Sequence, residues 1–128
     1  MGIPAAGGRK GRLKVLVVDD DSLFCQVMEV ILGLKRYVGE VRTAGCAAEA
    51  LEVFEEFEPD VVFVDHVMPS VAGDELGSHL RSLHPWLRLL SISALYGREK
   101  PSWADEHFTK NGDLFRNLER RLRGIALA

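Results

Sequence analysis

The chain has 128 residues, of which 47% are hydrophobic and 27% are charged, and its formal net charge is -3. This length suffices for one hydrophobic core of ordinary size and is too short for two full domains. No segment approaches the ~20 consecutive apolar residues of a membrane span, and the first residues lack an apolar signal-peptide core, so we expect a cytoplasmic protein without membrane insertion. The acidic balance gives no reason to expect direct binding of nucleic acid.

The order of apolar residues divides the chain into a leader, one folded domain and a short tail. Residues 1–12 are rich in glycine and basic residues without an apolar period, which indicates a flexible leader. We expect the domain to span residues 13–124 and the tail residues 125–128. Strands are predicted at residues 15–18, 41–44, 61–64, 87–92 and 107–110. Amphipathic helices are predicted near residues 23–34, 47–57, 76–83 and 114–125.

The alternation of strands and helices predicts an α/β fold. The first and third strands are short runs of apolar, mostly β-branched residues, as in strands that are buried on both faces. Right-handed crossovers between such strands place helices over both faces of a parallel sheet, which makes the fold doubly wound. The stretch 94–106 contains Gly97 and Pro101 and no sustained helical stripe, so the fourth helix is expected to be short or irregular.

Polar side chains stand at the predicted carboxyl ends of the strands, where open parallel sheets bind their ligands. They are Asp19, Asp20 and Asp21 after the first strand, Asp65 after the third, Ser93 after the fourth and Lys110 at the end of the fifth. Clustered carboxylates require a compensating cation, and their oxygen atoms suit Mg²⁺. The lysine adds a fixed positive charge and the serine a hydroxyl for a phosphoryl oxygen. The set therefore predicts phosphoryl transfer with a carboxylate nucleophile.

These motifs, in this order, resemble the response regulator receiver family of two-component systems. The motifs are Val17-Val18-Asp19-Asp20, the run 59–65 that ends in Asp65, Met68-Pro69, Gly73, Ser93-Ala94 and Lys110. The resemblance implies a flavodoxin-like fold of five βα units and a signalling switch. Such a domain receives a phosphoryl group from a histidine kinase or phosphotransfer protein and then changes its binding to a downstream protein. It implies no enzymatic activity beyond the domain's own phosphorylation and dephosphorylation.

The same resemblance assigns roles to individual residues. Asp65 is implied to be the phosphoacceptor. Mg²⁺ is implied to be ligated by Asp20, Asp65 and the backbone carbonyl of Val67, while Asp19 acts through the water shell of the metal. Ser93 is implied to be the switch hydroxyl.

Three departures from the family pattern fall in the C-terminal third. Lys110 corresponds to the lysine that contacts the phosphoryl group, yet it is followed by Asn111 where the family usually has proline. His107 stands where the family generally has Tyr or Phe, so we expect a histidine as the second switch residue. The stretch from Ser93 to Lys110 is shorter than usual, and the deficit falls on the fourth helix.

Two alternatives come from other function classes. Residues 19–22 also resemble the opening motif of haloacid-dehalogenase-type phosphohydrolases, in which Asp19 would be the nucleophile of a true enzyme. That family has a further acidic pair late in the sequence, which we do not find here. The other alternative is a receiver-like interaction module that binds its partner without phosphorylation, which Asn111 and the short fourth helix favour.

Some residues near these motifs have an equally good structural interpretation. Asp21 is placed as well to cap the first helix as to take part in the site. Cys25 and Cys46 lack the spacing of a zinc site or a disulfide framework, so we expect both to be reduced and semi-buried. Trp86 and Trp103 are expected to cover the edge of the core.

Overall fold

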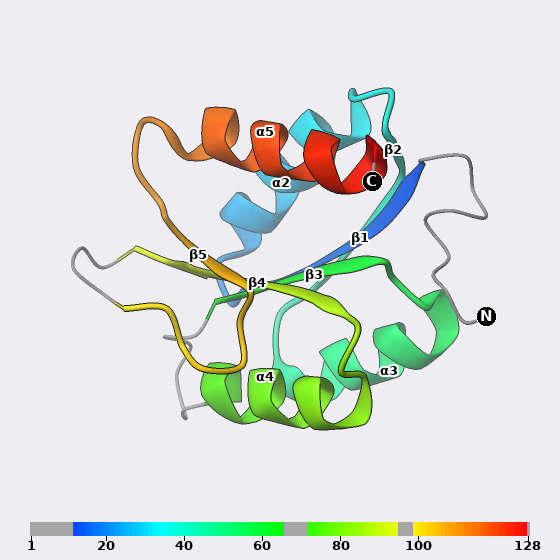
Figure 1. The fold of residues 1–128 in the computed structure, drawn as a ribbon, viewed down its shortest axis with the longest axis vertical. Coiled ribbons are helices and arrows are strands. Elements are labelled where there is room, and N and C mark those ends of the chain that lie inside the picture. Colours follow the sequence, from blue (N-terminus) through cyan, green and yellow to red (C-terminus); the bar gives the residue numbers. More distant parts are fainter. Residues whose placement is uncertain (1–11, 66–71, 95–98, 128) are drawn as a thin grey trace.

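Five parallel strands form the middle layer of the molecule in the computed structural model, which describes residues 12–65, 72–94 and 99–127 (Figure 1). The strands are β1 (Leu13–Val18), β2 (Val38–Ala44), β3 (Val61–Asp65), β4 (Arg88–Ser93) and β5 (Glu106–Thr109). They lie in the order β2-β1-β3-β4-β5, and every neighbouring pair is parallel. The chain steps from β1 to one side and then crosses back to the other, which confirms the predicted doubly wound sheet.

Helices cover both faces of this sheet (Figure 1). In the described residues they are α2 (Ser22–Gly33), α3 (Ala47–Phe57), α4 (Ala72–Leu83) and α5 (Leu114–Leu127). The helices α2 and α5 lie on one face, and α3 and α4 lie on the other. None of these helices is long and apolar enough to cross a membrane.

Each face of the sheet has its own hydrophobic core, because successive side chains of a strand point to opposite faces. On the side of α2 and α5, the fully buried strand residues include Val15, Val17 and Phe63. On the side of α3 and α4, they include Leu16 and Val62. The strands β1 and β3 are therefore buried on both faces, as their near-continuous apolar runs predicted.

The last helix buries the residues that its spacing predicted. Leu114, Leu118, Leu122 and Ile125 are all buried, and they form one side of α5 against the sheet and α2. Their spacing of three or four residues places them on a single stripe of the helix. The helix continues to Leu127, past the expected domain boundary at residue 124.

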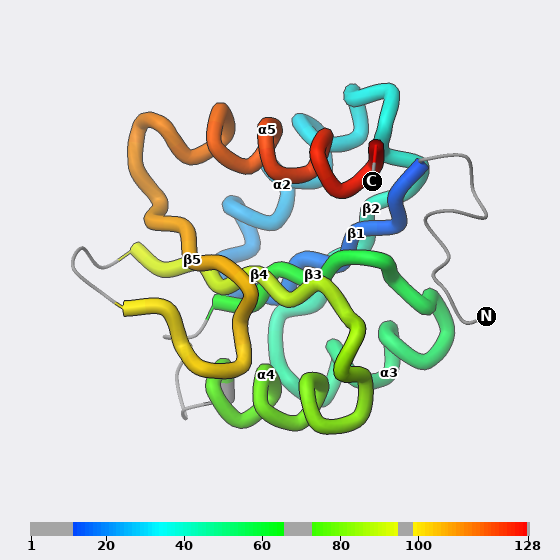
Figure 2. The backbone as a smooth tube through the Cα atoms, in the orientation of Figure 1, coloured from blue at the N-terminus to red at the C-terminus, as the bar shows by residue number. Residues whose placement is uncertain are grey.

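The connection between β4 and β5 is the irregular part of the fold. Its described residues, 94 and 99–105, contain no helix. This confirms the expectation that the helix between β4 and β5 is short or irregular. Figure 2 shows this connection, coloured yellow to orange, descending towards α4 before it turns back into β5. Trp103 lies there with 4% of its surface exposed, whereas Trp86 is 66% exposed. Of the two tryptophans, only Trp103 covers the core as expected.

Candidate functional site

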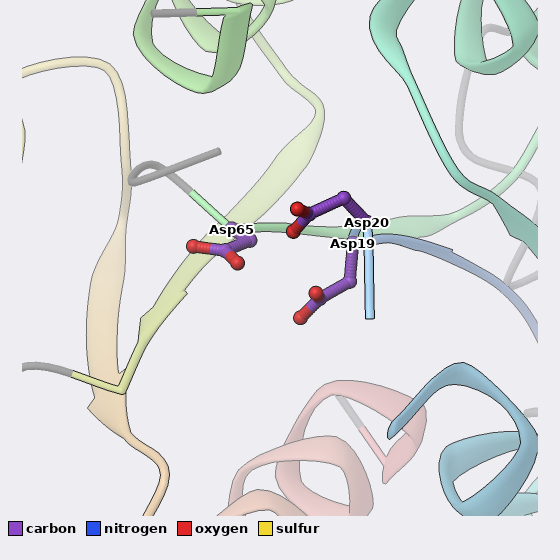
Figure 3. Close-up of side chains that lie close together, drawn as sticks. All are labelled: Asp19, Asp20 and Asp65. Carbon is purple, nitrogen blue, oxygen red and sulfur yellow. The ribbon is translucent and has the colours of Figure 1, made fainter. Parts of the chain in front are cut away.

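Three aspartate side chains meet at the carboxyl ends of β1 and β3 (Figure 3). Asp19 and Asp20 directly follow β1, and Asp65 is the last residue of the neighbouring strand β3. Each offers a carboxylate oxygen within 4.8 Å of the others. Asp19 is fully buried and Asp65 is 7% exposed, while Asp20 is open to solvent. The structure thus brings together the three acids that the strand ends predicted.

Lys110 brings a positive charge to these acids from the end of the edge strand β5. It follows β5 directly, and its backbone N–H donates to the carbonyl of Ser93 at 2.8 Å. Its Nζ lies 2.7 Å from Oδ2 of Asp19 and 3.8 Å from Oδ2 of Asp65. The same Nζ lies 4.2 Å from the centre of the Phe24 ring, a cation–π contact. The ammonium group is therefore held at the acid cluster, as predicted.

The electrostatics of the site are least favourable at Asp19. Burial raises the pKa of Asp19 above its ordinary value of 3.8, and the negative charge of Asp65 raises it further. The hydrogen bond from Lys110 and the one from the backbone N–H of Asp21 lower this pKa, but the net direction is upward. One lysine thus only partly compensates the carboxylates. An additional cation at this place would lower the free energy of the ionised site.

Mg²⁺ fits this arrangement of donors. The cluster offers hard carboxylate oxygens from two adjacent strand ends, and the exposed side chain of Asp20 leaves room for a partly hydrated ion. The backbone carbonyl of Val67, the other expected ligand, lies outside the described residues. The motif residues Met68 and Pro69 lie there as well.

Ser93 and His107 lie on the neighbouring strands β4 and β5, two register positions apart. Ser93 is fully buried and stands one residue beyond Ile92, which pairs in register with Asp65. The serine therefore ends β4 beside the end of β3. His107 pairs in register with Ser91, and its Nδ1 lies 2.6 Å from Oγ of this fully buried serine. The sequence predicted His107 as a switch residue and gave no separate signal for Ser91.

Asp21 caps α2, as the structural interpretation of this residue predicted. It precedes the helix with extended backbone angles, and its Oδ1 accepts hydrogen bonds from the backbone N–H groups of Leu23 and Phe24 at 3.1 and 3.2 Å. This satisfies two of the donors that a helix leaves open at its start. Asp21 thus fixes the turn by which Asp19 and Asp20 enter the site.

The two cysteines differ in their environments. Cys25 is buried on the first turn of α2, and its Sγ donates to the backbone carbonyl of Asp19 at 3.3 Å. Burial, and then the nearby charges of Asp19 and Asp21, raise the pKa of Cys25 to about 11, so its thiol stays protonated near neutral pH. Cys46 is exposed, so the expectation that it is semi-buried was wrong. It lies at the start of α3, outside the core.

Sequence reasoning missed the contacts of Phe24 and Cys25 with the site. Both residues lie one helical turn beyond the aspartates at the start of α2, and this spacing was the available signal. An aromatic residue or a thiol at such a position is usually part of a core, so the pattern alone did not separate the two roles.

The comparison with protein families matches residues 15–102 to the response regulator receiver domain. The chain belongs to the response regulator receiver family. The match confirms the resemblance drawn from the motifs, and a receiver domain is a phosphoacceptor signalling switch. The matched part of this receiver ends before Trp103, so β5, Lys110 and α5 lie beyond it.

Curated relatives of the receiver are larger proteins. The chain is 35% identical over 81 residues to the probable transcriptional regulatory protein TcrX of Mycobacterium tuberculosis, covering 62% of this chain and 33% of TcrX. It is 34% identical over 84 residues to a protein-glutamate methylesterase/protein-glutamine glutaminase of Hydrogenovibrio crunogenus, covering 66% of this chain and 22% of that protein. The receiver thus spans about a third or less of these two relatives.

Solved structures share the fold over most of the chain. Response regulator TrrA from Thermotoga maritima, solved in complex with Mg²⁺-BeF, superposes with a TM-score of 0.76 at 27% identity, covering 88% of this chain and 97% of TrrA. A complex of histidine kinase ThkA with TrrA matches with a TM-score of 0.70 at 28% identity, covering 85% of this chain and 97% of that chain. These likenesses support the flavodoxin-like assignment across the irregular C-terminal third.

Proposed function

We propose that Asp65 is the phosphoacceptor of this receiver and that Mg²⁺ binds beside it. The observation that carries the proposal is the cluster of Asp19, Asp20 and Asp65 with oxygen atoms within 4.8 Å of one another, and with Lys110 Nζ 3.8 Å from Asp65. Asp19 and Asp65 both reach the lysine and the other acids, and of these two Asp65 is the one that keeps some exposure to solvent, whereas Asp19 is fully buried. Asp20 is the acid most open to a hydrated cation.

The reaction transfers a phosphoryl group from a phosphohistidine to Asp65. A carboxylate oxygen of Asp65 attacks phosphorus, a P–O bond forms as the P–N bond breaks, and the imidazole leaves and takes up a proton from solvent. When bound, Mg²⁺ neutralises charge on the transferring oxygens. Lys110 provides a second positive charge, since its Nζ can turn from Asp19 towards a phosphoryl oxygen.

The switch follows from hydrogen bonds to the new group. Ser93 ends the strand beside Asp65, so its hydroxyl is placed to donate to a phosphoryl oxygen. His107 is joined to the same strand through Ser91, and a movement of β4 therefore acts on its ring. We propose these two residues as the switch pair that changes the binding of a downstream protein.

A histidine kinase or phosphotransfer protein is the proposed donor. The support is family membership together with the kinase complex of TrrA, a receiver of similar fold. The donor presents a phosphohistidine, whose P–N bond is labile enough to phosphorylate a carboxylate.

The test is phosphorylation of the purified chain by acetyl phosphate with Mg²⁺, followed by intact mass. We expect one phosphoryl group on the wild-type chain, none on Asp65→Asn, and none when EDTA removes the metal. Asp113→Asn, an exposed carboxylate at the start of α5, is the matched control and should react like wild type. Phosphorylation of Asp65→Asn at the wild-type rate would refute the assignment.

The interaction module remains the second candidate, because the connection between β4 and β5 has no helix in its described residues and is bound to α4 through Trp103. Absence of any phosphorylation, with a folded protein and Mg²⁺ present, would favour it. The phosphohydrolase alternative has less support, since its nucleophile Asp19 is fully buried and ion-paired with Lys110. Turnover of phosphate esters without a stable adduct would favour that alternative.

A further inference from the structure

The indole of Trp103 lies in a notch on α4. The notch exists because Gly77 has no side chain: a Cβ built at this position would overlap atoms of the indole ring. The indole Nε1 donates to Oδ1 of Asp74, one turn earlier on the helix, at 3.0 Å. We call Asp74, Gly77 and Arg81, three positions along one side of α4, the Trp103 seat.

Arg81 fixes the backbone around Trp103. Its Nε donates to the carbonyl of Trp103 at 2.9 Å, and its Nη2 pairs with Oδ2 of Asp105 at 3.0 Å. Asp105 in turn is bound to β4 through two hydrogen bonds with the backbone of Leu89. The half-buried guanidinium therefore joins α4, the connection and the beginning of β4. Such a planar group with several donors suits one position holding several segments.

The chain connects the two strand ends at the proposed acceptor site to the Trp103 seat. Asp65 ends β3, and the chain leaves it to enter α4, which carries Asp74. Ser93 ends β4, and the chain leaves it to enter the connection, which carries Trp103. The strands β3 and β4 are hydrogen-bonded to each other next to the site, and Asp74 and Trp103 are hydrogen-bonded to each other at the seat. The two strand ends at the proposed acceptor site thus lead, along the chain, to the two partners of the seat.

Ser93 and the connection between β4 and β5 pack on the same side of the sheet. Ser93 is fully buried and, by strand alternation, lies on the same side of the sheet as Leu89. Trp103 and Ala104 belong to the hydrophobic core on that side. A turn of the serine hydroxyl towards a phosphoryl group on Asp65 would change the packing on this side of the sheet. Well-packed interiors do not deform continuously, so such a change favours a second arrangement of the connection.

We propose that the Trp103 seat loosens when Asp65 is phosphorylated, and that the strength of the seat sets the fraction of the chain that is phosphorylated. This inference rests on the proposed function. By linkage, a contact that is weaker in the phosphorylated state opposes phosphorylation, and removing the contact favours it to the same extent. The seat thus regulates the site that it adjoins.

Trp103 itself provides the measurement. In a Trp86→Phe background, Trp103 is the only tryptophan of the chain. The side chain of Trp86 is exposed, and Arg81 contacts this segment through the backbone carbonyls of Pro85 and Leu87, which the substitution keeps. We expect acrylamide to quench Trp103 weakly before phosphorylation, because the indole is buried, and more strongly after it, because the loosened seat exposes the ring. Intact mass on the same samples reports whether Asp65 carries the phosphoryl group.

The two readouts separate the possible failures. If intact mass shows no phosphoryl group, the proposed function fails. If Asp65 is phosphorylated while the quenching of Trp103 stays the same, this inference is wrong. Asp65→Asn treated with the same reagents should show no change in quenching.

Variants of the seat test its influence on the site. Gly77→Ala displaces the indole, and Asp74→Asn weakens the bond to Nε1 while keeping the notch. Both should raise the phosphorylated fraction at a limiting concentration of acetyl phosphate. Gly124→Ala is the matched control for the glycine, since nothing lies within 4 Å of a Cβ at that position of α5. If Gly77→Ala fails to fold, Asp74→Asn still decides, and an unchanged phosphorylated fraction in this folded variant overturns the proposal.

Discussion

Asp19 is the residue at which the fold and the site make opposing demands. Its carboxylate is fully buried, and its raised pKa means that the folded state binds a proton more tightly than the unfolded chain does. In the pH window above its ordinary value of 3.8, the native state therefore holds more protons, and the free energy of unfolding falls as pH rises. The stability that protonated Asp19 provides is present at low pH and is lost as pH rises through the folded-state pKa.

Asp19→Asn is therefore expected to stabilise the protein near pH 7 without Mg²⁺, by about 1 kcal/mol, an ordinary size for one substitution. The amide removes the charge but retains an oxygen for the N–H of Asp21. Urea denaturation in EDTA measures the difference, which should shrink as the pH falls, because wild-type Asp19 then takes up its proton. Asp113→Asn controls for the loss of an exposed carboxylate. Equal or lower stability of Asp19→Asn at pH 7 would contradict this prediction.

At the scale of elements, α3 begins without a good cap. Its N-cap residue is Cys46, whose side chain makes no capping hydrogen bond, while Oε1 of Glu49 accepts from the backbone N–H of Gly45 at 2.8 Å. Serine at this position with glutamate three residues later is the arrangement of a capping box. Here the glutamate accepts from the residue before the N-cap, and the cysteine contributes no capping hydrogen bond.

Cys46→Ser is expected to raise the free energy of unfolding by about 0.5–1 kcal/mol, because the hydroxyl accepts a hydrogen bond from the first turn of α3. Thermal and urea denaturation measure this change. Ala48→Ser is the control, since it places the same residue inside the helix, where serine is a weaker helix former than alanine. If both variants lose stability, the cap is not what α3 lacks.

The sequence predicted the elements whose pattern is local. The buried stripe of α5 and the two-sided burial of β1 and β3 follow from spacing alone. The start of β2 was missed, because Gly39 and Glu40 interrupt its apolar run while Val38 already pairs with Leu13. Strand pairing depends on the partner, so this part could not be read from the segment itself.

The candidate site was predictable for a similar reason. A parallel sheet collects the carboxyl ends of its strands at one edge. Four residues of the site lie at such strand ends: Asp19, Asp20, Asp65 and Lys110. The seat of Trp103 was not predictable. It depends on a glycine of α4 that makes room for a side chain 26 positions later, which is a tertiary contact without a local signal.

At the scale of the whole molecule, the proposed binding of Mg²⁺ should add to stability. A ligand that binds the folded state alone stabilises it in proportion to the logarithm of its concentration above Kd. We expect millimolar Mg²⁺ to raise the melting temperature of wild type by a few degrees, and EDTA to reverse the shift. Asp20→Ala should reduce this shift most among the acids that follow β1. An equal shift in wild type and Asp20→Ala would argue against Asp20 as a ligand.

The division of the core between two faces also bears on how the chain folds during its synthesis. One face is closed by α5, the last of the described helices in chain order, which supplies the fully buried Leu118 and Leu122. Until those residues emerge, the apolar side chains of Val15 and Phe63 have no complete cover. A nascent chain that ends at residue 102 would present one bare side of the sheet, a surface that chaperones bind. This domain therefore completes its folding only after α5 has emerged from the ribosome.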